Sequence, residues 1–134
     1  MIRLTEDMKQ MIANNLAYVA TVDNDGNPDI GPKMSVGVLD DTHLFFYERT
    51  ARQTLRNMRA NGKLVIAVAN LESKKGYRFF GTLNLHKDDE IYADAITFAD
   101  EHGLKHPAVV PVLAVRRVDL LDAGPKAGTT IACD

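Results

Sequence analysis

Short apolar segments separated by strong turn signals constrain the fold of this chain more than any other feature. Small and β-branched residues fill positions 16–22, and the run "DNDGNP" at 23–28 is typical of a tight turn. A second strand is expected over 30–39; after the turn "DDTH", a third is expected over 44–47. Strands joined by such short turns pair antiparallel, so this part of the chain is predicted to form a β-meander.

The other segments alternate between helical and extended patterns. Helical spacing of apolar residues marks three segments, and apolar or alternating runs mark three further strands. The expected helices cover residues 5–14, 50–60 and 88–102, and the expected strands cover residues 64–69, 77–86 and 109–121. A total of about six strands favours a closed or partly closed antiparallel barrel over a doubly wound sheet. The Gly-rich tail, from about residue 122 to residue 134, is expected to be irregular.

The composition limits the classes of function. A chain of 134 residues predicts a single domain, and a net charge of −2 argues against a surface that is basic all over, as DNA binding would favour. The single cysteine, Cys133, excludes an internal disulfide and any multi-cysteine metal centre. No apolar run reaches the roughly 20 residues of a membrane span, and the N-terminus lacks the apolar core of a signal peptide. We therefore expect a cytoplasmic protein that binds neither nucleic acid nor membrane.

The segment "YERTARQTLRNMRANG", residues 47–62, carries the most chemical information. Four arginines and no acid occupy residues 49–62, where a strand ends and a helix begins. Positive charge is a poor match to the positive end of a helix dipole, so the pattern favours an anion bound there. Arg52, Gln53 and Thr54 would be the donors to a phosphate. The alternative is a solvated basic helix that pairs with acids elsewhere.

The segment "DIGPKMSVGV", residues 29–38, is unusual for a strand. Pro32 removes a ladder donor, which places this part at an edge, a bulge or a rim. Gly31 and Gly37 allow another group to approach the backbone, and Lys33 and Ser35 alternate onto one face. The segment is interpreted either as a backbone-lined groove for a flat ligand or as an edge strand blunted by Pro and Lys.

A third segment, "SKKGYRFFGTL" at residues 73–83, places three cations around a glycine. It is either a cationic hairpin loop or a second contributor to an anion or cofactor site. Gly81 inside the expected strand indicates a bulge or a close approach. No HExxH, CxxC, GxGxxG or GxSxG motif is present, so a metal site, a nucleotide fold or a simple hydrolase has little support.

The order of these pieces resembles a known family. The runs "VATVDNDGNPDIGP", "DDTHLFFY", "TARQTLRNMRANGKLVIAV" and "KGYRFFGTL" are followed by an acidic-start helix and a last strand. In this order they resemble the pyridoxamine 5'-phosphate oxidase-like FMN-binding split-barrel proteins over residues 16–121. The resemblance implies a mainly β fold with flanking helices, a six-stranded antiparallel Greek-key split β-barrel. It also implies a homodimer with FMN at the interface.

The resemblance also implies a set of cofactor-binding residues. Gln53 departs from the family pattern, because lysine is common there. The phosphate-binding residues just after the third strand would be Arg52, Gln53 and Thr54, with Thr50 nearby. The second strand would line the flavin, and Tyr77 and Arg78 of the second subunit would close the site. The full set implied for FMN is Pro32, Lys33, Met34, Ser35, Phe46, Tyr47, Thr50, Arg52, Gln53, Thr54, Tyr77 and Arg78.

The function implied is an FMN-dependent oxidoreductase, such as a flavin reductase, or an electron-transfer protein with a small-molecule or protein redox partner. Synthesis of pyridoxal phosphate is not expected, because the oxidase's C-terminal substrate-binding segment is not recognised. Two alternatives stay open at this point. One is a non-catalytic module that binds flavin or another phosphate-bearing ligand, and the other is a haem- or deazaflavin-binding member of the same fold.

Overall fold

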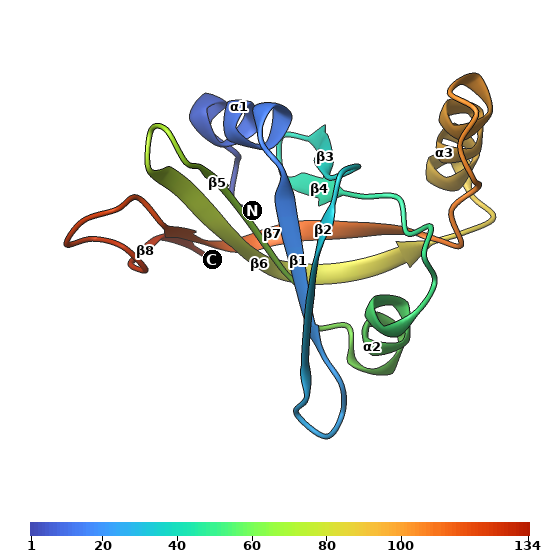
Figure 1. Ribbon diagram of the computed structural model, residues 1–134, viewed down its shortest axis with the longest axis horizontal. Helices are drawn as coiled ribbons and strands as arrows, with labels where there is room; N and C mark the ends of the chain where they lie inside the picture. The colour runs from blue at the N-terminus through green and yellow to red at the C-terminus, as the bar shows by residue number, and fades with distance from the viewer.

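The computed structural model describes residues 1–134 and contains three helices and eight strands (Figure 1). In chain order these are α1 (Glu6–Asn14), β1 (Ala17–Val22), β2 (Pro28–Lys33), β3 (Gly37–Asp40), β4 (His43–Phe45), α2 (Gln53–Asn61), β5 (Val65–Asn70), β6 (Lys75–His86), α3 (Glu90–Glu101), β7 (Val110–Leu120) and β8 (Thr130–Cys133). All three expected helices and the antiparallel character of the strands are confirmed.

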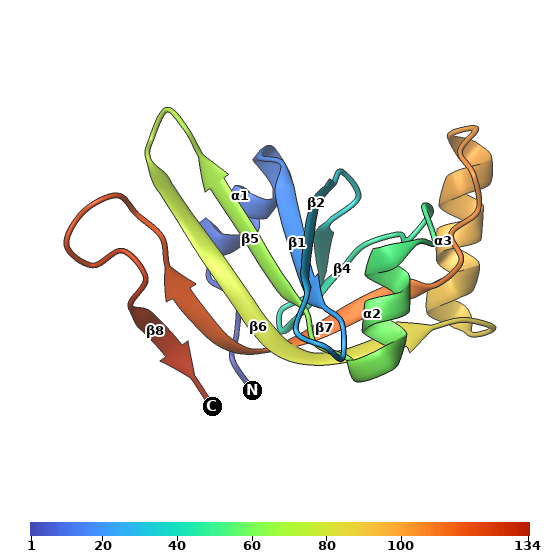
Figure 2. The same cartoon turned by 60° about the horizontal axis from the view of Figure 1, so that its bottom comes forward.

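The strands form one antiparallel sheet in the order β2-β1-β5-β6-β7-β4-β3, and β8 pairs with β7. Figure 2 shows that the long strands β6 and β7 bend, so that the sheet curls into a half-barrel. No hydrogen bonds join β2 to β3, which are the two ends of the strand order, so the barrel is split between them. Pro32 lies in β2, an edge strand, where a missing backbone donor is tolerated.

Gly81 lies where the pairing of β6 with β7 is irregular. The register between β6 and β7 shifts between Phe80 and Gly81, with Arg116 of β7 left unpaired, which confirms the bulge or close approach expected at Gly81. A Cβ atom at this position would lie 1.9 Å from the carbonyl oxygen of Ala114, so only glycine allows the strands to approach this closely.

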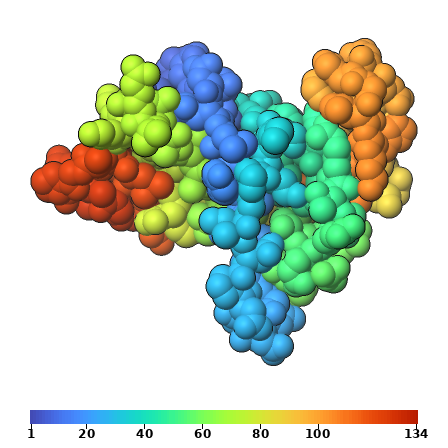
Figure 3. All heavy atoms as spheres, in the orientation of Figure 1, coloured from blue at the N-terminus to red at the C-terminus, as the bar shows by residue number.

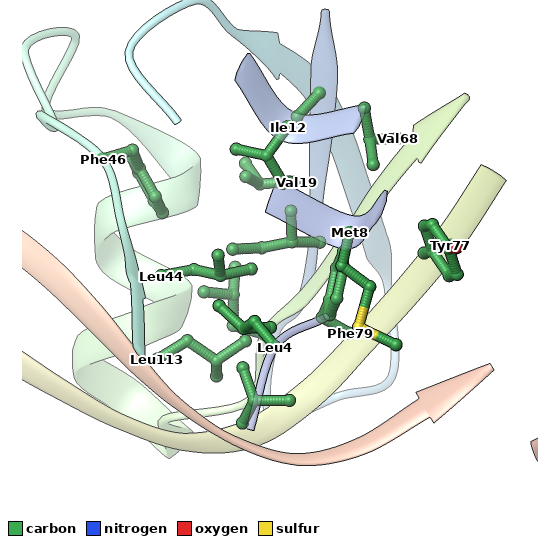
Figure 4. Packing of buried hydrophobic residues seen from close by; sticks show 14 of the residues in the cluster. Leu4, Met8, Ile12, Val19, Leu44, Phe46, Val68, Tyr77, Phe79 and Leu113 are labelled. Atoms are coloured by element: carbon green, nitrogen blue, oxygen red, sulfur yellow. The ribbon is translucent and has the colours of Figure 1, made fainter. Parts of the chain in front are cut away.

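The core fills the concave side of the sheet. Nineteen buried apolar residues form one cluster, which α1 covers with Met8 and Ile12. Figure 4 shows Leu44, Phe79 and Leu113 converging beneath this helix. The two other helices lie apart from α1, with α2 beside β1 and β2 and α3 at the end of the molecule opposite β8 (Figure 1). No helix is long and apolar enough to span a membrane.

The strand expected over 30–39 was wrong as a single element. A turn at Met34–Val36 divides it into β2 and β3, which lie at opposite edges of the sheet. The hydroxyl of Ser35 anchors this turn, because it accepts a hydrogen bond from the backbone N–H of Tyr47 at 2.8 Å. Gly37 is needed because a Cβ there would lie 2.9 Å from the ring of Phe45.

The C-terminal tail also differs from the expectation. Its last residues form β8, which pairs with β7 through Arg117↔Cys133 and Val118↔Ala132. The hydroxyl of Thr130 donates to the fully buried carboxylate of Asp119 at 2.8 Å, which ties β8 to the sheet. The split of 30–39 and the addition of β8 account for the eight strands in place of about six.

Candidate functional site

A polar cavity of about 190 Å³ lies at the N-terminal end of α2. Three parts of the chain build it: the inner face of β2, the segment that follows β4, and the first turn of α2. None of its seven lining residues is hydrophobic; they are Asp29, Lys33, Glu48, Thr50, Arg52, Gln53 and Thr54. The structure therefore brings together five of the residues implied by the family resemblance, namely Lys33, Thr50, Arg52, Gln53 and Thr54.

The alternation along β2 places two charged residues in this cavity. Side chains two and four residues apart share one face of a strand, so Asp29 and Lys33 both lie on the inner face. Ile30 lies between them in sequence, points outward and is 70% exposed. The turn before β2 projects from the body of the molecule, in light blue in Figure 3, and it leaves the inner face of β2 facing α2.

The start of α2 carries donors that have no partner in the chain. Its N-cap, Arg52, makes no side-chain capping bond, and its first turn contains no acid. The guanidinium of Arg52 and the hydroxyl of Thr50 make no hydrogen bond or ion pair. Free helix amides next to an unpaired guanidinium form an environment that favours an anion, such as a phosphate.

Lys33 and Glu48 form a nearly buried ion pair at one side of the cavity. The Nζ of Lys33 lies 3.0 Å from Oε1 of Glu48, with side chains 14% and 0% exposed. The backbone N–H of Ala51 also donates to Oε1 at 3.2 Å, and Nζ lies 5.9 Å from the ring centroid of Phe46. Lys33 therefore does not blunt an edge by pointing into solvent.

Hydrogen bonds hold the first turn of α2 in place. The hydroxyl of Thr54 donates to Oδ2 of Asp29 at 3.0 Å, which links α2 to β2. The amide of Gln53 donates to Oδ1 of Asn57 at 2.7 Å, and Asn57 in turn donates to the buried hydroxyl of Thr21. These bonds fix the cavity wall before any ligand arrives.

Five other residues implied by the resemblance lie outside the cavity lining in this chain. Pro32 and Met34 are exposed, and Met34 is 91% exposed in the turn between β2 and β3. Ser35 is engaged with the backbone of Tyr47, and Tyr47 is half-buried. Phe46 is fully buried and points into the core (Figure 4). Their roles toward a cofactor stay predictions.

The last two implied residues, Tyr77 and Arg78, lie on opposite faces of β6. The hydroxyl of Tyr77 donates to Asp7 of α1, and burial together with this bond raises the pKa of Tyr77 well above its usual value. Arg78 is 35% exposed on the outer face and bonds Asp119 at 2.8 Å. Neither lines the cavity of its own chain, so their role as closing residues from a second subunit stays a prediction.

Sequence reasoning missed two residues of the cavity, Asp29 and Glu48. The alternation that pairs Asp29 with Lys33 on β2 could have shown the first. No local signal marks Glu48, because its burial depends on Lys33 and on Val109, the residue before β7, to which its backbone is bridged. No group of three His, Cys, Asp or Glu side chains is arranged to hold a metal ion.

A second, larger groove of about 430 Å³ lies at the other end of α2. It opens on the outer side of the sheet, and five of its nine lining residues are hydrophobic. The lining residues are Ala20, Thr21, Val22, Gly62, Lys63, Leu64, Val65, Phe80 and Gly81. Its one charged residue, Lys63, offers little for catalysis.

Comparison with known proteins places this chain in a family. A family model described as pyridoxamine 5'-phosphate oxidase matches residues 4–122. The chain belongs to this family. An uncharacterized protein of Methanocaldococcus jannaschii is 28% identical over 137 residues, which cover 99% of this chain and 91% of that protein.

Two solved structures are similar to this chain in sequence as well as in fold. HupZ of Group A Streptococcus is 39% identical with a TM-score of 0.84, over 93% of this chain and 99% of that chain. A putative pyridoxamine 5'-phosphate oxidase of Lactobacillus delbrueckii is 34% identical with a TM-score of 0.75, over 87% of this chain and 93% of that chain. An FMN-binding protein of Syntrophomonas wolfei is 19% identical with a TM-score of 0.69, over 87% of this chain and 84% of that chain, and shows the fold alone.

Proposed function

We propose that this protein binds FMN and acts as an oxidoreductase or electron-transfer protein, with two copies of the chain enclosing the flavin. The polar cavity at the start of α2 is the observation that carries the proposal. Membership of the pyridoxamine 5'-phosphate oxidase family and the FMN-binding protein that shares the fold support the choice of cofactor.

The donor set of the cavity fits the phosphate end of FMN. A phosphate ester carries about −1.5 to −2 charges at neutral pH. The guanidinium of Arg52, the hydroxyl of Thr50 and the amides that begin α2 supply cationic and neutral donors without partners of their own. We assign the phosphate to these groups, with Gln53 and Thr54 forming the wall beside it.

The size of the cavity limits what part of the cofactor enters it. Pockets that enclose a whole drug-sized ligand measure about 300–1,000 Å³, and this cavity measures about 190 Å³. Only the phosphate and the adjoining part of the ribityl chain fit inside. The flavin ring therefore lies outside the cavity, on a surface that a second molecule would have to cover.

The outer face of the sheet offers a surface for contact with a second copy of the chain. The strand register places Ile30, Ala20, Val65 and Phe80 in one row across β2, β1, β5 and β6. Tyr18, 44% exposed, lies in the neighbouring row. Ile30 and Tyr18 are exposed, Ala20, Val65 and Phe80 are half-buried, and the 430 Å³ groove borders this row. Apolar side chains gathered on a surface in this way mark an interaction site. We assign this face to the homodimer.

Bound FMN would supply the redox chemistry, as an acceptor and donor of a hydride or of single electrons. The chain's own residues bind the phosphate, orient the ribityl chain and shield one end of the cofactor from water. Lys33 pairs with Glu48, and Asp29 accepts a hydrogen bond from Thr54, so these three charged side chains of the cavity are held by contacts within the chain. This arrangement suits electron or hydride transfer at the flavin without a side-chain proton donor.

An absorption spectrum of the purified protein, before and after addition of FMN, tests the proposal. We expect flavin bands that stay with the protein through gel filtration, and bleaching of these bands by NADH or NADPH with turnover. Bound flavin without turnover would contradict the oxidoreductase function and would favour a non-catalytic module that binds flavin. A Soret band, with no retained flavin, would contradict the proposal in favour of haem.

A further inference from the structure

Glu48 is the one carboxylate of the cavity that is completely buried, and one of its two oxygens has no partner. Lys33 and the N–H of Ala51 both donate to Oε1. No donor of the chain lies within hydrogen-bonding distance of Oε2, which is itself buried. A buried carboxylate oxygen without a donor costs free energy, so an unpartnered oxygen on a residue that lines the cavity favours a donor brought by a ligand.

The backbone around Glu48 holds the carboxylate rigidly in this position. Its N–H donates to the carbonyl of Val109 at 3.2 Å, and its own carbonyl accepts from Ala108 at 2.8 Å. Three residues later, Ala51 adopts φ 54°, a left-handed conformation that costs roughly 1–2 kcal/mol for a residue with a Cβ. This strained turn brings Arg52 and the start of α2 to the same cavity as Glu48, and the bond from Ala51 to Glu48 stabilises it.

The pairing of Glu48 with Lys33 selects the kind of donor. A carboxylate alone would attract a cation, but the ammonium of Lys33, 3.0 Å from Oε1, already balances its charge. A second ammonium would meet the like charge of Lys33 at close range. A neutral hydroxyl meets no such repulsion and can donate to Oε2.

We infer that Glu48 is a specificity-determining residue, whose Oε2 accepts a hydrogen bond from a hydroxyl on the carbon chain of a phosphate ester held by Arg52. The inference rests on the proposed function and adds a requirement to it. The cavity selects polyol phosphates, such as the ribityl phosphate of FMN, over phosphate esters without hydroxyls. The anionic end of the ligand meets the start of α2, and the hydroxyl-bearing chain meets Glu48.

The test compares two ligands across variants of the chain. FMN is titrated against an FMN analogue that keeps the ring and the phosphate but has a plain pentyl chain in place of ribityl. A hydrogen bond to a charged group is worth about a ten- to hundredfold change in Kd. We expect wild type to bind the pentyl analogue at least about tenfold more weakly than FMN.

The variant Lys33→Met/Glu48→Leu removes the ion pair as a unit, a replacement that buried pairs often tolerate without loss of stability. We expect the ratio of the two Kd values to fall about tenfold or more in this variant. In Glu48→Gln, where the amide oxygen can still accept from Lys33, we expect a smaller fall. The control is Asp29→Asn, in the opposite wall, which leaves the ratio at its wild-type value.

Equal affinity of wild type for FMN and the pentyl analogue overturns the inference without any variant. The inference is also overturned if the ratio of the two Kd values is the same in wild type and in both Glu48 variants. That result would mean that other groups bind the ribityl hydroxyls. Both results leave FMN binding itself intact. Failure of wild type to bind either ligand overturns the proposed function together with this inference.

Discussion

The hydroxyl of Thr54 donates to Oδ2 of Asp29 at 3.0 Å, and this bond places a carboxylate in the wall of the proposed phosphate site. A carboxylate there opposes a phosphate through like-charge repulsion. Asp29 therefore stabilises the start of α2 and weakens the binding of the anion at the same time.

Asp29→Asn is accordingly expected to tighten FMN binding. The amide oxygen of the new side chain still accepts from Thr54, while the negative charge is lost. A unit charge at close range near water is worth on the order of 1 kcal/mol, or about fivefold in Kd. Fluorescence titration with FMN and with riboflavin measures the effect. Riboflavin, which lacks the phosphate, should bind the variant as it binds wild type, and an equal gain for both flavins would place the phosphate elsewhere.

Lys33→Met is expected to destabilise the fold. The substitution leaves the carboxylate of Glu48 buried without its cation. Breaking a buried pair in this way costs about 3–5 kcal/mol, whereas substitutions of exposed residues stay within about 0.5 kcal/mol. Urea denaturation gives the free energy of unfolding, with Lys105→Met, an exposed lysine without a partner, as control. Equal unfolding free energies for the two variants would contradict the buried pair.

Asp119 is expected to make stability fall in acid. Hydrogen bonds from Arg117, Arg78 and Thr130 hold the pKa of Asp119 well below its usual range, against the opposing effect of burial. In the unfolded chain an aspartate titrates near pH 3.9. The stabilisation is therefore complete above about pH 5 and is lost as the pH falls below about 4 toward the lower folded-state pKa.

The variant Asp119→Asn isolates this contribution. It should lower the unfolding free energy at neutral pH by about 1.5–3 kcal/mol and flatten the decline in acid, because the group that titrates is gone. Thermal unfolding between pH 2 and 7 measures both effects. Asp25→Asn is the control, since the side chain of Asp25 is exposed and makes no hydrogen bond. If the stability of Asp119→Asn falls in acid as steeply as that of wild type, Asp119 is not the group that makes stability depend on pH.

Ile30→Asp is expected to convert a dimer into a monomer. Ile30 is 70% exposed in the apolar row on the outer face, and a charge there would be buried without a partner in the proposed interface. Light scattering at micromolar concentration, with FMN present, gives the mass. Leu71→Asp is the matched control, because Leu71 is 92% exposed but lies in the turn between β5 and β6. A wild-type monomer that retains FMN would contradict the interface site.

Much of this fold follows from local patterns. The helix expected over 5–14 forms, with Thr5 at its start accepting from the N–H of Met8 at 3.2 Å, and Gly81 lies at the close approach and bulge that its place in the strand indicated. The division of residues 30–39 was not predictable locally, because apolar alternation continues through it. Its cause is the bond between Ser35 and Tyr47, twelve residues apart.

The candidate site likewise has a part that the sequence could predict and a part that it could not. An acid-free, arginine-rich helix start is visible in sequence, and the structure leaves Arg52 unpaired as that pattern implies. Glu48 could not be found this way, since an acid after a strand is usually exposed. Its burial arises from contacts with Lys33 and Val109, which are distant in sequence. Likewise, β8 depends on Asp119, which no property of the tail itself indicates.

The affinity of the Arg52→Ala variant for FMN tests the central claim most directly. The control is Arg59→Ala, which removes an exposed arginine from the last turn of the same helix. Loss of a charge-assisted bond to phosphate should raise the Kd for FMN about ten- to hundredfold in Arg52→Ala. The Kd for riboflavin should not change, and Arg59→Ala should bind both flavins like wild type. An unchanged Kd for FMN in Arg52→Ala would contradict a phosphate site at the start of α2.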